Sequence, residues 1–551
     1  MSRYALGLDF GTESARALLV DADSGEIAAE AVAPYPDGVI DRALPGGTVP
    51  LPPEWALQNP LDWLSTLEGT VTRVLRDSAA DPASAVGIGI DFTACTILPT
   101  TADGTPLHAL ADYRAQPHAW AKLWKHHAAQ PQATRMNALA EQRGERWLAR
   151  YGGKISSEWL IPKALQLLEE APAIYGAAAW IVEGADWVVW QLTGALARNA
   201  CAAGYKGTWH KADGWVSSDF LRALNPALAD LNETKLAGPV VGPGTRVGGL
   251  TAEWAARLGL PEGTPVGAAI IDAHAAAPGG GVSGPGALFM VMGTSTCHML
   301  MAERELLAEG ISGVVEDGIV PGLFGYEAGQ AGVGDIFAWF VANGVPAATR
   351  AQAAERGVSV HALLSEQAAA LRPGQSGLLA LDWWNGCRTP LVDADLGGVV
   401  IGYTLQTSPA ALYRALIEAT AFGTRLIVET LQRAGVPVSS VRASGGLTAN
   451  ELLIQIYADV LGMPLEICAS PLASAIGAAM LGAVAGGAHP DVAAAAAAMA
   501  PVLSQTVQPD ARHRAVYDAL YAEYVRLVDY FGRAADSPLK RVRALREQPG
   551  A

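Results

Sequence analysis

The chain has 551 residues, too many for a single hydrophobic core, so two large domains are the default expectation. Half of the residues are hydrophobic and 17% are charged, which is typical of a well-buried globular enzyme. The formal net charge of -16 argues against a nucleic-acid partner or an anionic membrane surface, and no apolar run reaches the roughly 18 residues of a membrane span.

The five cysteines are scattered along the chain without a Cys-x-x-Cys pair. This spacing predicts reduced, mostly buried thiols in a cytoplasmic protein rather than a disulfide framework or a zinc site. The first residues, Met1-Ser2-Arg3, lead directly into an apolar segment, so we expect no signal peptide.

The first half of the chain is predicted to alternate strands with helices. Apolar runs bounded by turn residues predict strands over residues 4–10, 15–21, 26–32 and 85–91. Apolar residues at helical spacing predict a helix over residues 60–77. This alternation is typical of an α/β domain.

A break in the pattern near the middle of the chain predicts a domain boundary. Residues 122–127 are predicted to lie in a helix, and a buried strand is expected over residues 266–272. The run Pro278-Gly279-Gly280-Gly281 follows at once. We therefore expect one domain over residues 1–279 and a second over residues 280–551.

The second half is predicted to end its core with a strand, a turn and a helix. The strand is expected over residues 441–444 and the helix over residues 449–461. From about residue 489 the chain is alanine-rich and predicted to be helical. The charged tail, residues 540–547, is expected to fray.

One strand–turn–strand pattern occurs in both halves, over residues 4–21 and 286–303. In each copy an apolar strand runs into Gly-Thr, as Gly11-Thr12 and as Gly293-Thr294-Ser295. Glycine permits a sharp turn that leaves N–H groups exposed, and the hydroxyls add donors. Either copy alone is more typical of an ordinary hairpin turn. Their repetition predicts two related domains that bind the phosphates of one nucleotide.

A third glycine turn, Gly445-Gly446, is expected to lie between a strand and a helix. The free N–H groups at the start of that helix are suited to an anion. The chain contains no Walker A loop and no Gly-x-Gly-x-x-Gly after a strand.

The two hairpins differ in one residue of chemical interest. The first carries Asp9 where the second carries Val291. A carboxylate beside bound phosphates is reasonable if a hard cation such as Mg²⁺ lies between them.

Asp272 is the best candidate for a general base. Phosphoryl transfer to a hydroxyl needs positioning, charge neutralisation and a carboxylate that accepts the hydroxyl proton. Asp272 follows a buried strand close to the expected boundary between the domains. The alternative is a helix N-cap, for which aspartate is also favoured, and the spacing does not decide between them.

Three further side chains are candidates for binding a polyol. Lys206 and Glu327 are charged residues in apolar or aromatic surroundings, and Trp124 could form a flat wall for a sugar. The alternatives are a salt bridge or an extended side chain for Lys206 and Glu327, and ordinary packing for Trp124. Without further context these alternatives are favoured.

Four motifs together resemble the FGGY family of carbohydrate kinases: residues 7–16 (Gly-Leu-Asp-Phe-Gly-Thr-Glu-Ser-Ala-Arg), the strand that ends at Asp272, residues 292–295 (Met-Gly-Thr-Ser), and residues 443–450 (Ala-Ser-Gly-Gly-Leu-Thr-Ala-Asn). The resemblance extends from residue 4 to about residue 487. It implies an α/β fold with two actin-like ATPase domains, each with an RNase H-like sheet, around an interdomain cleft that holds ATP and a sugar.

The resemblance also implies a role for individual residues. Asp272 is the expected base, and Asp9 and Asp272 are expected near Mg²⁺. The residues expected around a ketopentose are Ala94, Trp124, Lys206, Asp272 and Glu327. The residues expected around ATP are Gly11, Thr12, Gly293, Thr294, Ser295, Gly445, Gly446 and Asn450.

Within the family, motifs at residues 90–96, 203–206, 272–275, 325–330 and 382–390 favour ribulose as the sugar. Cys387 departs from the expected pattern, but it lies outside the residues assigned to catalysis. The alternatives are a kinase for another ketopentose or a pentitol, an actin-like ATPase that drives partner binding, and a sugar sensor without activity. The expected partners are ATP and a small sugar, without nucleic acid or membrane, and a homodimer is the oligomer that we consider.

Overall fold

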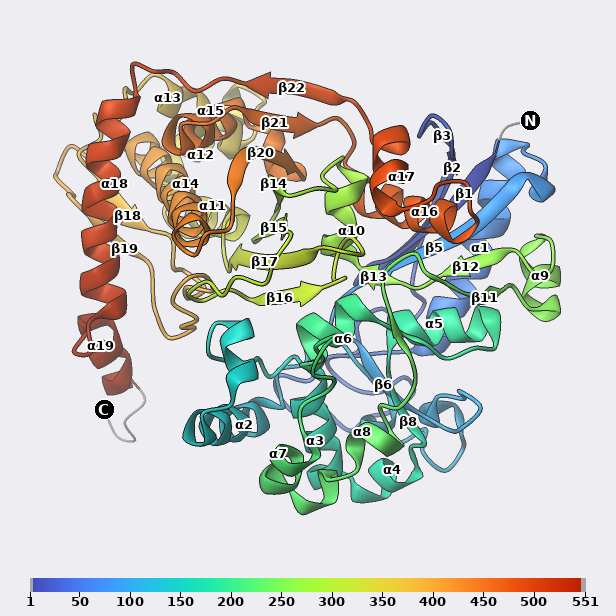
Figure 1. The fold of residues 1–551 in the computed structure, drawn as a ribbon. Coiled ribbons are helices and arrows are strands. Elements are labelled where there is room, and N and C mark those ends of the chain that lie inside the picture. Colours follow the sequence, from blue (N-terminus) through green and yellow to red (C-terminus); the bar gives the residue numbers. More distant parts are fainter. Residues whose placement is uncertain (1–2, 547–551) are drawn as a thin grey trace.

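The computed structural model describes residues 3–546, so Met1, Ser2 and Glu547 of the charged tail lie outside the described residues. Two seven-stranded sheets form the centre of the molecule, one in each half of the chain (Figure 1). The strands of the first sheet are β1 (Tyr4–Phe10), β2 (Ser14–Asp21), β3 (Ile27–Pro34), β5 (Ala85–Phe92), β11 (Arg246–Gly249), β12 (Pro265–Gly267) and β13 (Ile270–Ile271). The strands of the second are β14 (Gly286–Met292), β15 (Thr296–Ala302), β16 (Gly313–Glu316), β17 (Phe324–Gln330), β20 (Val438–Ser444), β21 (Leu465–Cys468) and β22 (Leu503–Val507).

The two sheets share the order of five strands. The order β3-β2-β1-β5-β12 in the first corresponds to β17-β15-β14-β20-β21 in the second. Strand β1 pairs antiparallel with β2 and parallel with β5, and β14 pairs in the same way with β15 and β20. A further antiparallel strand lies at the end of each order, β11 beside β12 and β22 beside β21. This is the order of an RNase H-like sheet. The predicted fold of two actin-like ATPase domains is confirmed, and the repeat seen in the hairpins extends to the whole sheets.

Nineteen α-helices surround the sheets in the described part of the chain. Those of the first half are α1 (Pro60–Ser78), α2 (Gln130–Arg143), α3 (Leu160–Glu170), α4 (Pro172–Ala177), α5 (Gly184–Thr193), α6 (Ala200–Gly207), α7 (Ser218–Leu224), α8 (Leu231–Thr234), α9 (Ala252–Leu258) and α10 (Asp272–Gly279). Those of the second half are α11 (Gly334–Asn343), α12 (Ala347–Glu355), α13 (Val360–Ala369), α14 (Pro409–Arg433), α15 (Glu451–Leu461), α16 (Ala473–Ala485), α17 (Val492–Met499), α18 (Arg514–Val528) and α19 (Pro538–Arg546).

The remaining strands form small sheets. One has the order β4-β7-β6-β8, and with α2, α3 and α4 it makes a lobe below the first sheet (Figure 1). Its strands are β4 (Leu57–Gln58), β6 (Ile97–Thr100), β7 (Ala121–Lys122) and β8 (Trp180–Glu183). Two-stranded ribbons join β9 (Arg198–Asn199) with β10 (Val240–Val241) and β18 (Leu379–Leu381) with β19 (Val399–Ile401).

Helix α1 shows how the local sequence sets an element. The side chain of Asn59 accepts a hydrogen bond from the N–H of Leu61, and Pro60 occupies the first turn, where its missing N–H costs nothing. The apolar face buries Trp63 and Val71 against β2 and β3. The helix ends at Ala79, which is left-handed with φ 52°.

Helices α16 and α17 belong to the second half of the chain but pack on the first sheet. Figure 1 shows them in red-orange beside the blue strands β1, β2 and β5. Leu18 and Val20 of β2 share one apolar cluster with Met480 and Met499. The second half of the chain thus supplies a helical layer of the first domain. The domain boundary between residues 279 and 280 stays a prediction.

Glycines permit this close approach. A Cβ atom on Gly89 would lie 1.9 Å from the carbonyl oxygen of Ala478, and one on Gly7 would lie 2.2 Å from that of Ala475. Glycine normally weakens a strand interior, and its usual justification is the approach of another backbone. The helices α10 and α16 meet in the same way, since a Cβ on Gly477 would lie 2.0 Å from the carbonyl oxygen of Ala275.

The predicted strands and helix of the first 92 residues are confirmed to within two residues at each end. Two predictions near the sites are wrong. Residues 122–127 form the end of β7 and a turn instead of a helix, because Leu123 N–H donates to Ala56 and His127 N–H donates to Glu54. Residues 266–272 form two short strands, because Ala268 leaves the sheet to bond with Thr245.

Two predictions in the second half also need correction. The region after residue 489 is not helical throughout, since β22 interrupts it and extends the sheet beside β21. The helix after Gly445-Gly446 does not begin at those glycines. A 3₁₀ turn, Gly446–Ala449, comes first, and Asn450 caps α15 by accepting from Leu453 N–H. In the tail, α19 includes residues 540–546.

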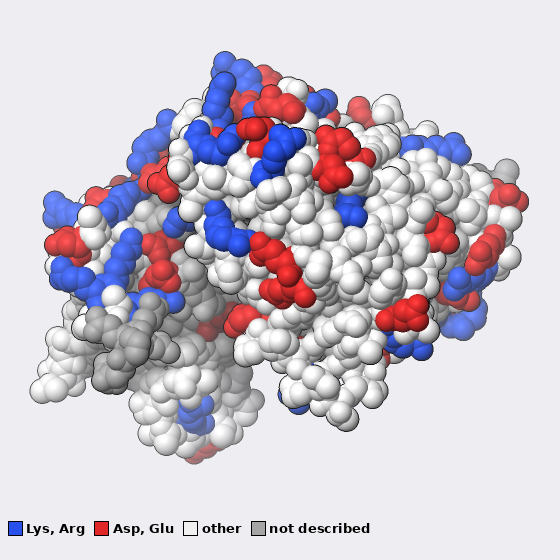
Figure 2. Space-filling model, turned by 90° about the horizontal axis from the view of Figure 1, so that it is seen from below, with Lys and Arg blue, Asp and Glu red and all other residues white. Residues whose placement is uncertain are grey.

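The surface carries mixed charge. On the face drawn in Figure 2, acidic and basic side chains are interspersed and separated by broad uncharged areas. Exposed ion pairs on the molecule include Arg356 with Glu366 (2.8 Å) and Arg514 with Asp518 (3.0 Å). Among residues 3–546, no helix is long and apolar enough to cross a membrane.

We expect the substitution Gly89→Ala to lower the thermal midpoint of unfolding, because the new methyl group would overlap the backbone of α16. Overpacking of this kind typically costs about 1–3 kcal/mol. The matched control is Gly69→Ala in α1, where a Cβ meets nothing within 4 Å and alanine is the better helix former. Equal midpoints for the two variants, measured by calorimetry, would contradict the close packing of α16.

Candidate active site

Three aspartates lie at the carboxyl ends of neighbouring parallel strands. Asp9 on β1 and Asp91 on β5 are direct partners in the sheet register. Ile270 of β13 pairs with Asp91, and Asp272 follows the end of β13 immediately. The parallel pairing therefore brings the three carboxylates together. Parallel strands present their carboxyl ends at one edge of the sheet, which is where α/β proteins place their ligands.

Asp91 is absent from the residues predicted above. Its side chain is fully buried, no N–H or hydroxyl group among the described residues donates to it, and its carboxyl group is hydrogen-bonded to that of Asp9. Burial raises the pKa of Asp91 well above its ordinary value, and the charges of Asp9 and Asp272 raise it further. The sequence did hold a signal, since Gly89-Ile90-Asp91-Phe92 repeats the pattern Gly-Leu-Asp-Phe that ends at Phe10.

Asp272 is the first residue of α10, and the N-cap position belongs to Ile271. Its Oδ1 accepts a hydrogen bond of 2.6 Å from the N–H of Ala273. Burial raises the pKa of Asp272 to about 7, with further contributions from Asp9 and Glu327, while the Ala273 bond and Lys206 act in the opposite direction. A carboxylate with a pKa near neutrality is suited to accept a proton at physiological pH.

Lys206 and Glu327 form a buried ion pair between the two halves of the chain. Nζ of Lys206 on α6 lies 2.8 Å from Oε2 and 3.0 Å from Oε1 of Glu327 on β17. Nε2 of His274 lies 3.3 Å from the same Oε2. Burial acts to raise the pKa of Glu327, but Lys206 and His274 outweigh it and hold this pKa well below its ordinary value. The salt-bridge alternative for both residues is therefore observed.

Trp124 lies at the first Gly-Thr turn. Its Nε1 donates a 3.0 Å hydrogen bond to Oγ1 of Thr12, and Gln58 Nε2 donates to the Thr12 carbonyl at 2.7 Å. The turn itself closes through Gly11 N–H, which donates to Ser14. Ala94 packs against the apolar cluster that includes Trp124 and also against the cluster that includes Ala273. The structure thus places Trp124 beside the first Gly-Thr turn, while Ala94 borders both apolar clusters.

The second Gly-Thr turn meets the Gly445 turn. Gly445 has φ 100°, and a Cβ there would lie 2.4 Å from the carbonyl oxygen of Met292, the residue before Gly293. Gly293 N–H donates to Ser295, and the carbonyl of Thr294 accepts from Val333 N–H. The parallel pairing of β14 with β20 is the reason for this proximity, because Val291 and Ser444 are partners in register.

A cavity of about 1030 Å³ opens beside these turns in the second half of the chain. Gly446 and Asn450 line it, and Gly334, which packs on the Gly293 carbonyl, forms part of its edge. The side chain of Asn450 is already engaged on both sides, since it caps α15 and donates to Ser365 Oγ at 3.0 Å. Gly446 and Asn450 thus line the same cavity. Gly293 lies next to it, because its carbonyl contacts Gly334 at the edge of the cavity.

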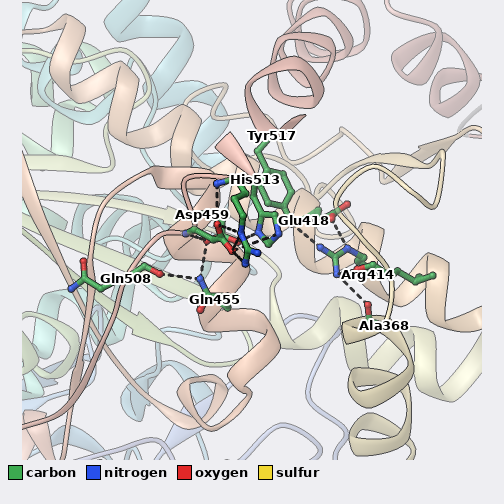
Figure 3. A network of polar contacts seen from close by, with 11 residues as sticks. Ala368, Arg414, Glu418, Gln455, Asp459, Gln508, His513 and Tyr517 are labelled. Carbon is green, nitrogen blue, oxygen red and sulfur yellow. Dashed lines mark hydrogen bonds and ion pairs between the residues drawn. The ribbon is translucent and has the colours of Figure 1, made fainter. Parts of the chain in front are cut away.

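A network of polar side chains borders the cavity, and His513 brings the C-terminal part of the chain to its wall (Figure 3). His513 Nδ1 lies 2.7 Å from Asp459 Oδ2, and Gln455 donates to the other oxygen of Asp459. On the adjoining side, Arg414 donates to Glu418 and to the hydroxyl of Tyr517. No sequence motif marks these residues, because they meet only when α14, α15 and α18 pack together.

The comparisons with known proteins identify the family of the chain. A family model described as the FGGY family of carbohydrate kinases, N-terminal domain, matches residues 4–279, and the corresponding C-terminal domain matches residues 288–486. A protein named Ribulokinase from Geobacillus thermodenitrificans is 53% identical over 99% of this chain and 97% of its own length. Proteins of the same name from Halalkalibacterium halodurans and Mycolicibacterium smegmatis are 52% and 50% identical, each over 99% of this chain and over 98% and 96% of their own lengths.

Solved structures give the same result for the fold. A xylulose kinase from Rhodospirillum rubrum has a TM-score of 0.79 at 25% identity and covers 96% of this chain and 98% of its own. A gluconate kinase from Lactobacillus acidophilus has a TM-score of 0.78 at 16% identity and covers 97% of this chain and 99% of its own.

Breaking the Lys206–Glu327 pair from either side should destabilise the protein, because the remaining charge would be buried without its partner. Removing one member of a buried pair typically costs about 3–5 kcal/mol. We expect the double variant Lys206→Met/Glu327→Gln to unfold at a higher temperature than either single variant. If the decreases in unfolding temperature of the two single variants simply add in the double variant, the result would contradict the pairing. As the exposed control, Glu366→Gln should change the midpoint little, because its partner Arg356 stays solvated.

Proposed function

Because this chain belongs to the FGGY family of carbohydrate kinases, we propose that it phosphorylates ribulose, with L-ribulose the favoured isomer. The products are ribulose 5-phosphate and ADP. The observation that carries this proposal is the identity of 50–53% to proteins named Ribulokinase over nearly the whole of both chains. All five cysteines are free and four of them are buried, which supports a location in the reducing cytoplasm. ATP is available in that compartment.

Asp272 is the proposed general base. The terminal hydroxyl of the sugar must lose its proton as it attacks the γ-phosphorus, and Asp272 has the raised pKa that such a base needs. The carboxyl end of β13 and the first turn of α10 hold it in place. This role leaves the remaining site residues the tasks of positioning and charge compensation.

The proposed sugar site lies between Trp124, Ala94 and the Lys206–Glu327 pair. A buried ammonium and a buried carboxylate present a fixed donor and a fixed acceptor, and sugar hydroxyls can bond to both. Trp124 offers a flat apolar face of the kind that packs on a sugar ring or chain. The two members of the ion pair come from different halves, so the site would be complete only when both halves are in contact with the sugar.

The proposed ATP site is the cavity at Gly446 and Asn450, with the phosphates along Gly293-Thr294-Ser295 towards Gly11-Thr12. The volume of about 1030 Å³ is ample for a nucleoside. Backbone N–H groups at glycine turns bind phosphate oxygens without the interference of a side chain. The two hairpins would then each contribute one turn to a single nucleotide.

The carboxylates fit a magnesium ion. Asp9 lies on β1 and Asp272 follows β13, and both strands pair with β5 next to Asp91, whose carboxyl group is hydrogen-bonded to that of Asp9. Residues 3–546 contain no group of three or more His, Cys, Asp or Glu side chains that could hold a metal ion by themselves. Mg²⁺ commonly takes one or two carboxylates and completes its shell with water and phosphate oxygens. Asp9 and Asp272 would hold it, and it would supply charge neutralisation for the phosphates.

An assay of ADP release across D- and L-ribulose, D- and L-xylulose, ribitol and arabitol tests the substrate. We expect the highest kcat/KM with L-ribulose. A pentitol or xylulose that exceeds it would reassign the substrate, and sugar-independent ADP release would favour the ATPase alternative.

In the same assay, Asp272→Asn should bind sugar nearly normally and lose about 10²–10⁴-fold in kcat. A variant that keeps more than about a tenth of the activity would exclude Asp272 as the base.

The pH profile of the same reaction should carry the signature of Asp272. The ionised carboxylate is the active form, so kcat/KM should rise with pH through a limb near the pKa of about 7 and fall away on the acidic side. The residual activity of Asp272→Asn should lack this limb.

Asp9→Ala should weaken the use of magnesium while sugar binding, measured by calorimetry, stays close to that of the wild type. The reason is that only the first of the two hairpins carries a carboxylate at its turn. The rate is measured as a function of Mg²⁺ at fixed ATP, and the half-saturating concentration should rise. A magnesium dependence like that of the wild type would remove Asp9 from the metal site.

A further inference from the structure

Lys163 is a buried lysine that the chemistry described so far does not use. It lies on α3 and its side chain is fully buried. Its Nζ donates to three backbone carbonyl oxygens: that of Cys95 at 2.6 Å, that of Leu123 at 2.8 Å and that of Lys122 at 3.4 Å. An ammonium group has three donors and no acceptor, so these bonds use its full capacity.

The three carbonyls belong to two segments that carry proposed sugar contacts. Cys95 follows Ala94 in the loop between β5 and β6, and Leu123 precedes Trp124 after β7. The sheet itself joins these segments only through the pair Ile97 and Lys122. Cys95 also has φ 56°, a left-handed conformation that an L-residue keeps only when its surroundings hold it.

The charge of Lys163 is compensated by carbonyl oxygens rather than by an ion pair. A charge removed from water is tolerated only where other dipoles or charges replace the hydration. Here the carbonyls do so at hydrogen-bond distance, and the acidic side chains of Glu183 and Glu158 also favour the charged form of Lys163. Burial nevertheless lowers the pKa of Lys163 to about 8. Loss of the ammonium would take a donor from each carbonyl. Leu123 would keep the N–H of His126 at 2.9 Å, but the Cys95 carbonyl would lose the donor that binds it, which is unfavourable.

We propose that Lys163 is a positioning residue of the sugar site, and that its ammonium group clamps the Ala94 loop to the Trp124 segment. Trp124 in turn donates to Thr12 Oγ1, so the clamp also fixes the first Gly-Thr turn. All of these groups lie in the first half of the chain. The Ala94–Trp124 wall of the sugar site would therefore be formed before the second half contributes Glu327. This inference rests on the sugar site proposed above.

Lys122 provides a matched control. It is also buried, at 2% exposure, and it lies beside Lys163. Its Nζ lies over the ring of Trp55 at 5.4 Å from the centroid. Among residues 3–546, its ammonium donates no hydrogen bond to a carbonyl of either segment. The clamp uses only the backbone carbonyl of Lys122, which Lys122→Met retains, so this variant removes a neighbouring buried charge and keeps all three acceptors of the Lys163 ammonium.

The test compares Lys163→Met, Lys163→Arg and Lys122→Met in the full-length enzyme. We expect Lys163→Met to raise the KM for ribulose about tenfold or more, as for lost bonds to a charged group, and to change the KM for ATP less than twofold. Lys163→Arg keeps the charge and donors and should lie between this variant and the wild type. Lys122→Met should keep the wild-type KM for ribulose.

Hydrogen exchange separates this inference from the substrate assignment. In the absence of any ligand, amides in peptides covering residues 93–97 and 121–125 should exchange faster in Lys163→Met than in Lys122→Met. A protein that phosphorylates none of the sugars but shows this difference would overturn the function and keep the clamp. A folded Lys163→Met with a ribulose KM within twofold of the wild type, or with equal rises in both KM values, would overturn the clamp. If Lys163→Met does not fold, Lys163→Gln is judged by the same criteria.

Discussion

The close approach of α16 to the first sheet and to α10 is the contact on which the site depends. Gly7 and Asp9 lie on one face of β1, and Gly89 and Asp91 lie on one face of β5, because side chains alternate along a strand. At Gly7 and Gly89 the backbone of α16 comes close to the two strands, and Asp9 and Asp91 follow two residues later along each strand. The pattern Gly-x-Asp-Phe therefore combines two requirements, a close helix and a carboxylate.

The second sheet shows what happens without that contact. The residue that corresponds to Gly7 is Phe289, whose ring occupies the space where a Cβ on Gly280 would lie, 2.2 Å away. The residue that corresponds to Asp9 is Val291. The two halves thus keep the same strand order while their inner faces differ. One face carries the acidic groups proposed for catalysis, and the other is apolar and leads to the turn beside the cavity proposed for the nucleotide. The two halves thus share a strand order, and a few side chains that differ between them account for the different roles proposed for the two halves.

The sequence predicted the parts that depend on local chemistry. The hairpins, the helix after Asn59 and the glycine turns were all accessible, because turn residues and apolar periodicity act over a few positions. The failures were nonlocal. The segment that holds Trp124 has a helical composition, but its amides bond to residues 54–56, which are close only in the folded chain. The same reason hid the position of α16 and the contribution of His513 to the cavity wall. Asp91 is an intermediate case, since its motif was visible and only the parallel register gave it a meaning.

The two buried lysines near the sugar site are held by different kinds of partner, and this difference has a consequence for how the site assembles. Lys163 is bound by carbonyls of its own half, so its geometry is fixed by local folding alone. Lys206 is bound by Glu327 of the other half, so its charge is compensated only where the halves meet. A buried ion pair contributes little net stability, because desolvation offsets most of the attraction, but an unpaired member is strongly disfavoured. The pair therefore acts against states in which the halves separate. Because the proposed sugar site includes both members of the pair, a sugar whose hydroxyls bond to Lys206 and Glu327 together would add to the contact between the halves.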